Sequence, residues 1–176
     1  MNLVLSPHND DESLFLAFTI MREKCPVLII TDSWIQHLRG DPVEADERWA
    51  ESCASADILG CPIKRLGIRD DCLWEPYLIE ALKEYTCFEK VYAPALQGGN
   101  VHHDIVHRAA KAVWGDNVIE YTTYTKTELY TKGNIEVKPT REEIEIKNNA
   151  LMCHKSQFII NRPHFDAVFG KSEWLM

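Results

Sequence analysis

The sequence predicts a protein of the α/β class, in which helices cover both faces of a mostly parallel β-sheet. Short apolar runs typical of strands buried on both faces alternate with longer segments whose apolar residues fall on one helical face. The spacing of these runs is that of βαβ units. A chain of 176 residues can bury a proper core without disulfide or metal staples. No repeat, low-complexity tract or linker divides the sequence, so residues 1–176 are expected to form a single domain.

The first two predicted strands each precede a helix. Residues 2–6 form a short, continuous apolar run. Residues 13–24 keep apolar side chains on one helical face and end in basic residues, which suit a helix C-terminus. A second buried strand is expected at 26–32, and a second helix at 43–60 is stopped by Gly60.

The same alternation continues through the middle of the chain. A short strand is predicted at 63–67, a helix at 75–86 and a strand at 90–95. A helix at 103–114 and a strand at 117–124 follow. Strand–helix–strand units of this length place successive strands parallel in one sheet.

The pattern changes after this fifth strand. Residues 127–139 are expected to form a β-hairpin around a Lys-Gly-Asn turn signal at 132–134. Residues 140–157 have the pattern of an amphipathic helix, in which Thr140 and Glu143 stand at capping-box spacing. The predicted architecture is therefore a Rossmann-like sheet followed by a C-terminal hairpin plus helix.

Composition restricts the partners and the location of the protein. The formal net charge of -8 opposes binding to nucleic acid or anionic membranes, because phosphate binding needs a basic surface. No stretch approaches the roughly 20 apolar residues of a membrane span, and the N-terminus lacks the features of a secretory signal. The six cysteines form no C-x-x-C pair and are interpreted as reduced core thiols, which favours a cytoplasmic location. Homo-oligomerisation stays open.

The first predicted strand ends in a dense polar run from His8 to Glu12. Ligands of open α/β sheets bind outside the carboxyl ends of the strands. One interpretation is that Asp10, Asp11 and Glu12 are acids that favour the first turn of a helix. The other is that His8 and Asp11, three positions apart, turn toward one point, where imidazole and carboxylate are natural zinc ligands.

A catalytic zinc ion needs a third protein ligand and an open position for water. Further histidines cluster only in the stretch GGNVHHDIVH, which contains His102, His103 and His107. This stretch also follows a predicted strand at its carboxyl end, so both polar clusters lie on the same rim of the sheet and could share a metal. Taken alone, histidines at a helix start are better explained by solvation and helix capping.

Four motifs resemble those of one family. PHNDDE, at residues 7–12, resembles the P-H-P-D-D-E signature of the PIG-L/LmbE-like deacetylases, with Asn9 in place of a proline. QGGNVHHDI is similar to the second family motif, G-x-G-H-x-D-H. ERWAESCASADILG is similar to a family helix and carries Arg48, and KNNALMCHKSQ is similar to a later segment and carries His154. The motifs occur in the family's order and span most of the chain.

The resemblance implies a zinc enzyme that removes an N-acetyl group from an N-acetylglucosamine-type conjugate. His8, Asp11 and His103 would hold Zn2+, and Asp10 would be the general base. Zinc lowers the pKa of its bound water to about 7, which creates a nucleophile for the acetamide carbonyl. Asp10 could take the proton of that water and return it to the leaving amine. The products would be acetate and a primary amine.

Arg48 is a candidate substrate-binding residue, because its planar fork suits sugar hydroxyls or an attached anionic group. The alternative is a helix-surface charge paired with Asp46 or Glu51.

The family's further histidine corresponds to Asn100, which donates a hydrogen bond but carries no titrating proton. His102 or His154 would then substitute near the substrate, or Asp10 would act alone as base and acid. His102 also stands where many members have aspartate, so a third nitrogen ligand or a shifted register stays open.

Two rival functions each account for part of the sequence. In one, His103-Asp104-x-x-His107 is a helical zinc site of a peptidase, but this leaves PHNDDE unexplained. In the other, the protein is a non-catalytic sugar-binding module, against which the intact Asp10 beside Asp11 argues.

The aromatic and remaining histidine residues carry weaker signals. Trp34 and Trp74 follow strands and could stack on a sugar ring, although packing is the favoured interpretation. His37 and His164 are interpreted as loop or core residues. The sequence does not select among sugar conjugates.

Overall fold

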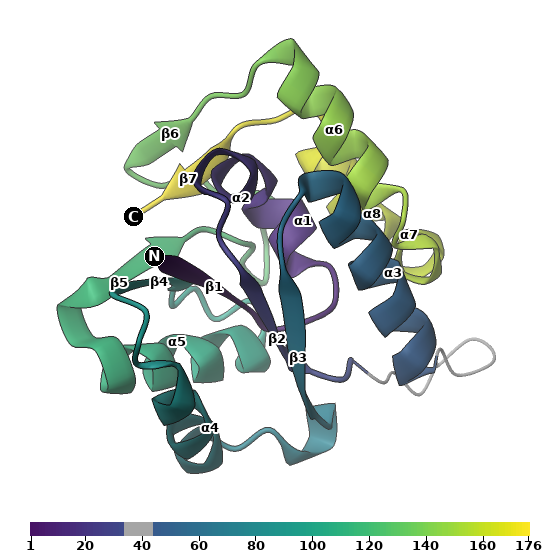
Figure 1. The fold of residues 1–176 in the computed structure, drawn as a ribbon. Helices are drawn as coiled ribbons and strands as arrows, with labels where there is room; N and C mark the ends of the chain where they lie inside the picture. Colours follow the sequence, from purple (N-terminus) through teal and green to yellow (C-terminus); the bar gives the residue numbers. More distant parts are fainter. Residues whose placement is uncertain (34–43) are drawn as a thin grey trace.

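The computed structural model describes residues 1–33 and 44–176, which form a seven-stranded sheet flanked by helices (Figure 1). The strand order is β3-β2-β1-β4-β5-β7-β6. The first five strands of this order are parallel and the last two pair antiparallel. The strands are β1 (Asn2–Ser6), β2 (Val27–Thr31), β3 (Ile63–Ile68), β4 (Lys90–Pro94), β5 (Val118–Tyr121), β6 (Ile135–Val137) and β7 (Glu173–Leu175). The predicted α/β class and mostly parallel sheet are confirmed.

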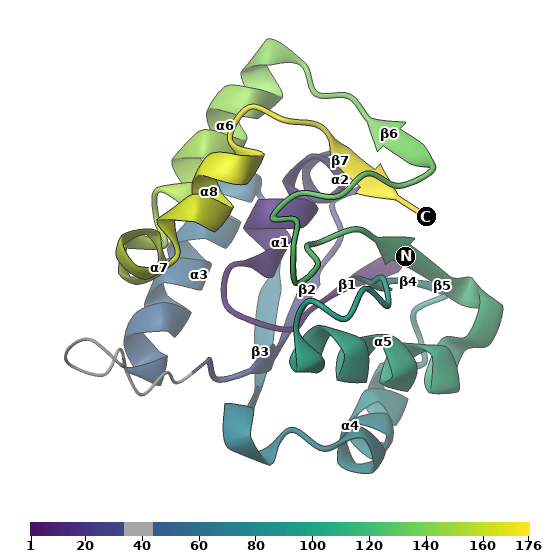
Figure 2. The same ribbon diagram turned by 180° about the vertical axis from the view of Figure 1, so that it is seen from behind.

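Helices cover both faces of the sheet, as the continuous apolar strands require. They are α1 (Asp11–Phe15), α2 (Ala17–Glu23), α3 (Ala45–Leu59), α4 (Glu75–Leu82), α5 (Val101–Trp114), α6 (Arg141–Leu151), α7 (Lys155–Ile160) and α8 (Arg162–Val168). Short 3-10 turns lie at η1 (Asp70–Cys72), η2 (Lys83–Tyr85) and η3 (Gly115–Asn117). Helices α4 and α5 lie on one face, and α1, α2, α3, α6 and α8 pack on the other (Figure 2). Along β1, Leu3 and Leu5 pack on the face covered by α4 and α5, and Val4 packs on the opposite face, because successive side chains of a strand point to opposite sides of the sheet. None of the helices described is long and apolar enough to cross a membrane.

The strand order creates a natural ligand crevice at the carboxyl end of β1. From β1 the chain moves outward through β2 to β3, and then returns to β4 on the other side of β1. Val4 consequently pairs with Val27 on one side and with Tyr92 on the other. Such a reversal is the point at which doubly wound sheets bind ligands.

The helix predicted at 13–24 is divided in two. Leu16, with φ -136° and ψ 12°, separates α1 from α2. The free N–H groups of Phe18 and Thr19 at the start of α2 donate to the Glu173 carboxylate, at 3.0 and 3.3 Å. The sequence predicted one continuous helix here, but an acid that is distant in the sequence caps a second helix at its start.

The hairpin predicted at 127–139 is wrong. Only β6 forms a strand in this segment, and it pairs with β7 instead of its local neighbour. The first half of the segment turns inward, because the Thr131 carbonyl accepts from the Thr122 hydroxyl at 3.0 Å. The Lys-Gly-Asn signal at 132–134 does not reverse the chain into a hairpin, and the strand partner of β6 is β7, at the C-terminal end of the sequence.

The helix predicted at 140–157 ends early, at Leu151. Its capping box is confirmed: Glu143 N donates to Thr140 Oγ1 at 3.2 Å, and the Glu143 carboxylate accepts from Thr140 N at 2.7 Å. The later elements α7, α8 and β7 were not predicted.

Candidate active site

Three side chains from two separate stretches of the sequence converge at the carboxyl end of β1. His8 comes from the loop after β1, Asp11 is the first residue of α1, and His103 comes from the first turn of α5. Asp11 Oδ2 lies 3.0 Å from His8 Nδ1 and 3.1 Å from His103 Nε2. The facing nitrogens of the two imidazoles are 3.3 Å apart. The structure thus brings together the three residues that the sequence proposed as metal ligands, all within 4.8 Å of one another.

Hydrogen bonds made by the side chains of Ser6 and Asp11 shape the loop after β1. His8 N donates to Asp11 Oδ2 at 2.9 Å, which turns both side chains to the same side. The Ser6 hydroxyl lies 2.8 Å from the His8 carbonyl and 2.9 Å from the Glu12 carboxyl group. Burial, with the nearby Asp10 carboxylate, raises the pKa of Glu12 to about 8, so this acid is mostly protonated at neutral pH.

Asn9 holds this loop to the neighbouring elements. Its backbone N–H donates to Ser33 Oγ at 3.0 Å, and its Nδ2 donates to Ser52 Oγ of α3 at 3.1 Å. A proline at this position could make neither bond. Asn9, which stands where the resembled motif has a proline, therefore contributes hydrogen bonds that hold the loop in place.

Asp10 is nearly buried and lies beside a guanidinium. Arg48 Nη2 is 3.4 Å from Asp10 Oδ2. Burial raises the pKa of the Asp10 carboxyl group above its ordinary value; Arg48 opposes this shift, and the Asp11 carboxylate adds to it. Burial would also raise the pKa of Asp11, but His103 and His8 outweigh it and lower that pKa. The two adjacent acids therefore differ in their affinity for a proton.

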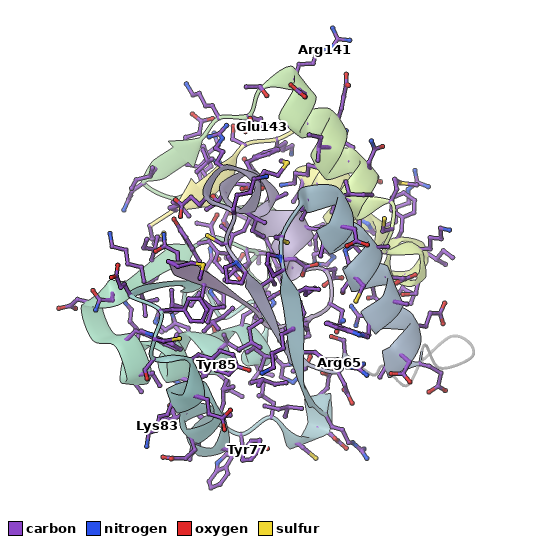
Figure 3. The ribbon with its side chains drawn as sticks, viewed as in Figure 1. Arg65, Tyr77, Lys83, Tyr85, Arg141 and Glu143 are labelled. Atoms are coloured by element: carbon purple, nitrogen blue, oxygen red, sulfur yellow. The ribbon has the colours of Figure 1, made fainter. Side chains whose placement is uncertain are left out.

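Arg48 is not a surface charge, so the alternative interpretation of this residue is wrong. Only 2% of the residue is exposed, and Nη1 donates to the Ser33 carbonyl at 2.9 Å. Asp46 pairs instead with Arg65 of β3, which is labelled beside α3 in Figure 3. Glu51 accepts hydrogen bonds from Ser156. Arg48 therefore points inward, to the site.

The first turn of α5 is fixed by its cap. Asn100 Oδ1 accepts from His102 N at 2.8 Å, and Asn100 Nδ2 donates to the Tyr124 hydroxyl at 3.1 Å. His102 Nδ1 lies 2.9 Å from His8 Nε2. Gly99 is required here, because a Cβ atom would lie 2.1 Å from the Tyr124 carbonyl oxygen.

The ring of His103 is anchored on the side away from the cluster. Its Nδ1 lies 3.3 Å from Thr123 Oγ1. Gln97 Oε1 in turn accepts from the Thr123 N–H at 2.6 Å. This orientation leaves His103 Nε2 facing Asp11 and His8.

The helical zinc site proposed as a rival does not form. His107 Nδ1 lies 3.0 Å from the Pro94 carbonyl, and Asp104 accepts from Gly98 N at 3.1 Å. Neither belongs to the one group of potential metal ligands found among residues 1–33 and 44–176. Of this motif only His103 faces the cluster.

The structure does not bring His154 to the site surface, where substrate contact was expected. The residue is fully buried, and its Nε2 lies 3.2 Å from Ser13 Oγ and 3.7 Å from Glu12 Oε1. Burial, with the Arg48 charge, lowers the pKa of His154 to about 3, so the imidazole is neutral. His154 supports the first helix from behind.

A cavity of about 290 Å³ opens beside the cluster. The residues expected at the site, other than His103 and His154, contribute to its wall: His8, Asp10, Asp11, Arg48, Asn100 and His102. Asp70 of η1 lines it as well, and its Oδ1 atom is buried without a hydrogen-bond partner in the part of the chain that the structure describes. Nothing in the sequence had singled out Asp70.

The opposite wall comes from the C-terminal helices and was also missed. Gln157, Asn161 and His164 line the cavity, and the His164 ring lies 4.8 Å from that of Tyr124. His164, interpreted from sequence as a loop or core residue, therefore belongs to the site. Gln157 stands at the end of the fourth motif, which was the one available signal.

The two tryptophans proposed for sugar stacking are not part of this cavity. Trp74 is 66% exposed and lines a separate groove between β3 and α4. Its expected packing role is therefore wrong as well, because most of its surface faces solvent. Trp34 and His37 lie outside the described residues.

No protein-family model and no curated protein matches the chain. Among solved structures, the zinc-inhibited form of teicoplanin deacetylase is similar at 13% identity and a TM-score of 0.76, covering 99% of this chain and 97% of that one. N,N'-diacetylchitobiose deacetylase from Pyrococcus horikoshii is similar at 18% identity and a TM-score of 0.76, covering 99% and 82%. A 4-carboxy-2-hydroxymuconate hydratase from Pseudomonas putida is similar at 14% identity and a TM-score of 0.71, covering 99% and 94%. The chain thus has the fold that the motif resemblance implies, and that fold carries more than one reaction.

Proposed function

We propose that the chain is a metal-dependent amide hydrolase that removes an N-acetyl group from an N-acetylglucosamine-type conjugate. The observation that carries this proposal is the cluster of the partly buried His8 with the buried Asp11 and His103, which opens on a cavity beside Asp10. The four sequence motifs and the deacetylases among the structural neighbours support it.

The residues fit a catalytic zinc ion. Two imidazole nitrogens and one carboxylate oxygen form the ligand set of several catalytic zinc sites, which keep a further position open. His103 Nδ1 has its own partner in Thr123, so Nε2 is the nitrogen left for a metal. When bound, such an ion supplies a Lewis acid and lowers the pKa of a water molecule to about 7.

Asp10 is the proposed general base. Its carboxyl group lies in the cavity wall next to the ligand Asp11, within reach of a water that attacks an acetamide carbon. Asp10 accepts the proton of that water and delivers it to the amine nitrogen as the C–N bond breaks. Arg48, at 3.4 Å, orients the carboxylate and favours its ionised form against the cost of burial.

The sugar conjugate would occupy the cavity on the solvent side of Asp10. Arg48 and Asn100 are proposed substrate contacts, because both line this space. Arg48 also has a second task, since its two terminal nitrogens already face Asp10 and the Ser33 carbonyl. A small-molecule substrate suits the modest size of the cavity. The free thiols of all six cysteines fit the proposed cytoplasmic location.

Acetate release from a panel of N-acetylglucosamine conjugates tests the proposal, with zinc measured on the same preparations. Asp10→Asn should keep its zinc and lose at least about 100-fold in rate, the scale of general acid–base catalysis. His8→Ala should lose zinc. Asp104→Asn is the matched control, because this acid adjoins His103 but bonds to Gly98 away from the cluster.

Two results would count against the proposal. An Asp10→Asn enzyme that retains zinc and full activity would remove the base from the mechanism. A zinc-loaded wild-type protein that releases no acetate from the whole panel would overturn the substrate class.

A further inference from the structure

His8 has a partner at each nitrogen of its ring. Nδ1 faces the proposed metal ligands, at 3.0 Å from Asp11 Oδ2 and 3.3 Å from His103 Nε2. Nε2 lies 2.9 Å from His102 Nδ1. A neutral imidazole carries one N–H, so an Nδ1 that gives its lone pair to a metal leaves the proton on Nε2. That proton then needs an acceptor.

We infer that His102 is a positioning residue whose Nδ1 accepts the Nε2–H of His8 and so fixes the tautomer and ring orientation in which His8 binds the metal. This inference rests on the metal site of the proposed function. It goes beyond that function because it gives His102 a task that requires no contact with substrate.

The backbone holds His102 in place for this task. Its N–H donates to Asn100 Oδ1 at the start of α5, so the residue belongs to a capped helical turn. The His102 and His8 ring centroids are 5.2 Å apart, with an angle of 44° between the planes, which lets one nitrogen of each ring meet the other. His102 and His103 are adjacent, so a single turn of α5 supplies a ligand and the support for another ligand.

The arrangement at His8 repeats the one at His103. The nitrogen of His103 remote from the cluster lies 3.3 Å from Thr123 Oγ1, as that of His8 lies 2.9 Å from His102. Metal-binding histidines commonly have such an acceptor on the second nitrogen, and its removal lowers metal affinity about 10–100-fold. Each proposed imidazole ligand therefore has its own orienting partner.

A direct catalytic or substrate-binding role is the competing assignment for His102, since the ring also lines the cavity. The two roles differ in what they change. Loss of a substrate contact alters turnover or KM but leaves the affinity for zinc intact. Loss of a positioning residue weakens zinc binding in the absence of any substrate.

The test is the zinc dissociation constant of the metal-stripped full chain, measured by competition with a chromophoric chelator. His102→Ala should bind zinc about 10–100-fold more weakly than the wild type. His102→Asn should restore most of the affinity, because the asparagine Oδ1 atom can occupy nearly the place of Nδ1. His164→Ala is the control: this imidazole also lines the cavity but contacts Tyr124, and its loss should leave the constant unchanged.

Circular dichroism and melting temperature of the stripped variants verify that each one is folded. Zinc binding by His102→Ala as tight as in the wild type would overturn the positioning role and leave the metal site intact. A loss shared equally by the alanine and asparagine variants would also overturn it, since the acceptor would then not matter. A wild-type chain that binds no zinc would instead refute the metal site itself, and the positioning role with it.

Discussion

Replacement of Lys147 by methionine should destabilise the protein more than any exposed lysine substitution. Lys147 Nζ of α6 lies 2.9 Å from Glu173 Oε1 of β7, and both side chains are 1% exposed. Lys147 also donates to the Leu14 carbonyl at 2.8 Å. Glu173 accepts from the N–H groups of Phe18 and Thr19. The ion pair therefore ties together α1, α2, α6 and β7.

The expected cost follows from these contacts. Removal of one partner of a buried ion pair leaves an uncompensated charge and costs about 3–5 kcal/mol. Methionine fills most of the volume of the lysine stem, so the cavity contribution is small. The two amide donors retained by Glu173 favour the lower end, about 3 kcal/mol. At about 2–4 °C per kcal/mol for a chain of this size, the melting temperature should fall by about 6–12 °C.

Urea and thermal unfolding at pH 7 provide the assay. Lys147→Met, Glu173→Gln and the double variant form a cycle, in which the double variant should be at least about 1 kcal/mol more stable than the sum of the single effects predicts. Lys83→Met is the control, because its pair with Glu80 is exposed and should be worth less than about 1 kcal/mol. A loss below about 1 kcal/mol for Lys147→Met, or strictly additive effects, would refute this reasoning.

Three further predictions concern other elements. Hydrogen bonds from Arg22 lower the pKa of Glu143, labelled on α6 in Figure 3, from 4.5 to about 2. The wild type should therefore be more stable than Glu143→Gln above pH 4.5, and this difference should disappear as the pH falls toward 2. Urea unfolding across this pH range measures the difference. Gly99→Ala should cost about 1–3 kcal/mol and weaken zinc binding, because the new Cβ would overlap the Tyr124 carbonyl; unchanged unfolding and zinc titration would contradict the close approach. His107→Ala should keep its zinc in elemental analysis, and loss of the metal would revive the helical site.

The central parallel strands could be predicted because their burial on both faces leaves a direct pattern in the sequence. All five residues of β2 are buried, and the first four of them form an uninterrupted apolar run. The antiparallel edge could not be predicted in this way. β6 and β7 have three residues each, and their pairing joins Ile135 to Leu175, which no local turn signal reveals.

The core of the site was predictable for a similar reason. His8 and Asp11 lie three positions apart, and His103 follows a parallel strand whose carboxyl end faces the same edge. His154 and Arg48 show the limit of this reasoning. Some polar side chains support the site from behind, and others contact its ligand. A helical pattern in the sequence looks the same in both cases, and only the packing of α1 against its neighbours tells them apart.

The position of β7 between β5 and β6 also determines the order in which the fold can be completed. Residues 2–121 contain all five parallel strands, so that part of the sheet can assemble from strands that follow one another along the chain. β6 must wait until β7 has been synthesised, because β7 is its neighbour in the sheet. Glu173 arrives with β7, and its bond to Phe18 spans 155 positions, a contact of the kind that forms slowly. The bonds that hold the start of α2 therefore need a residue that is synthesised only after all five parallel strands.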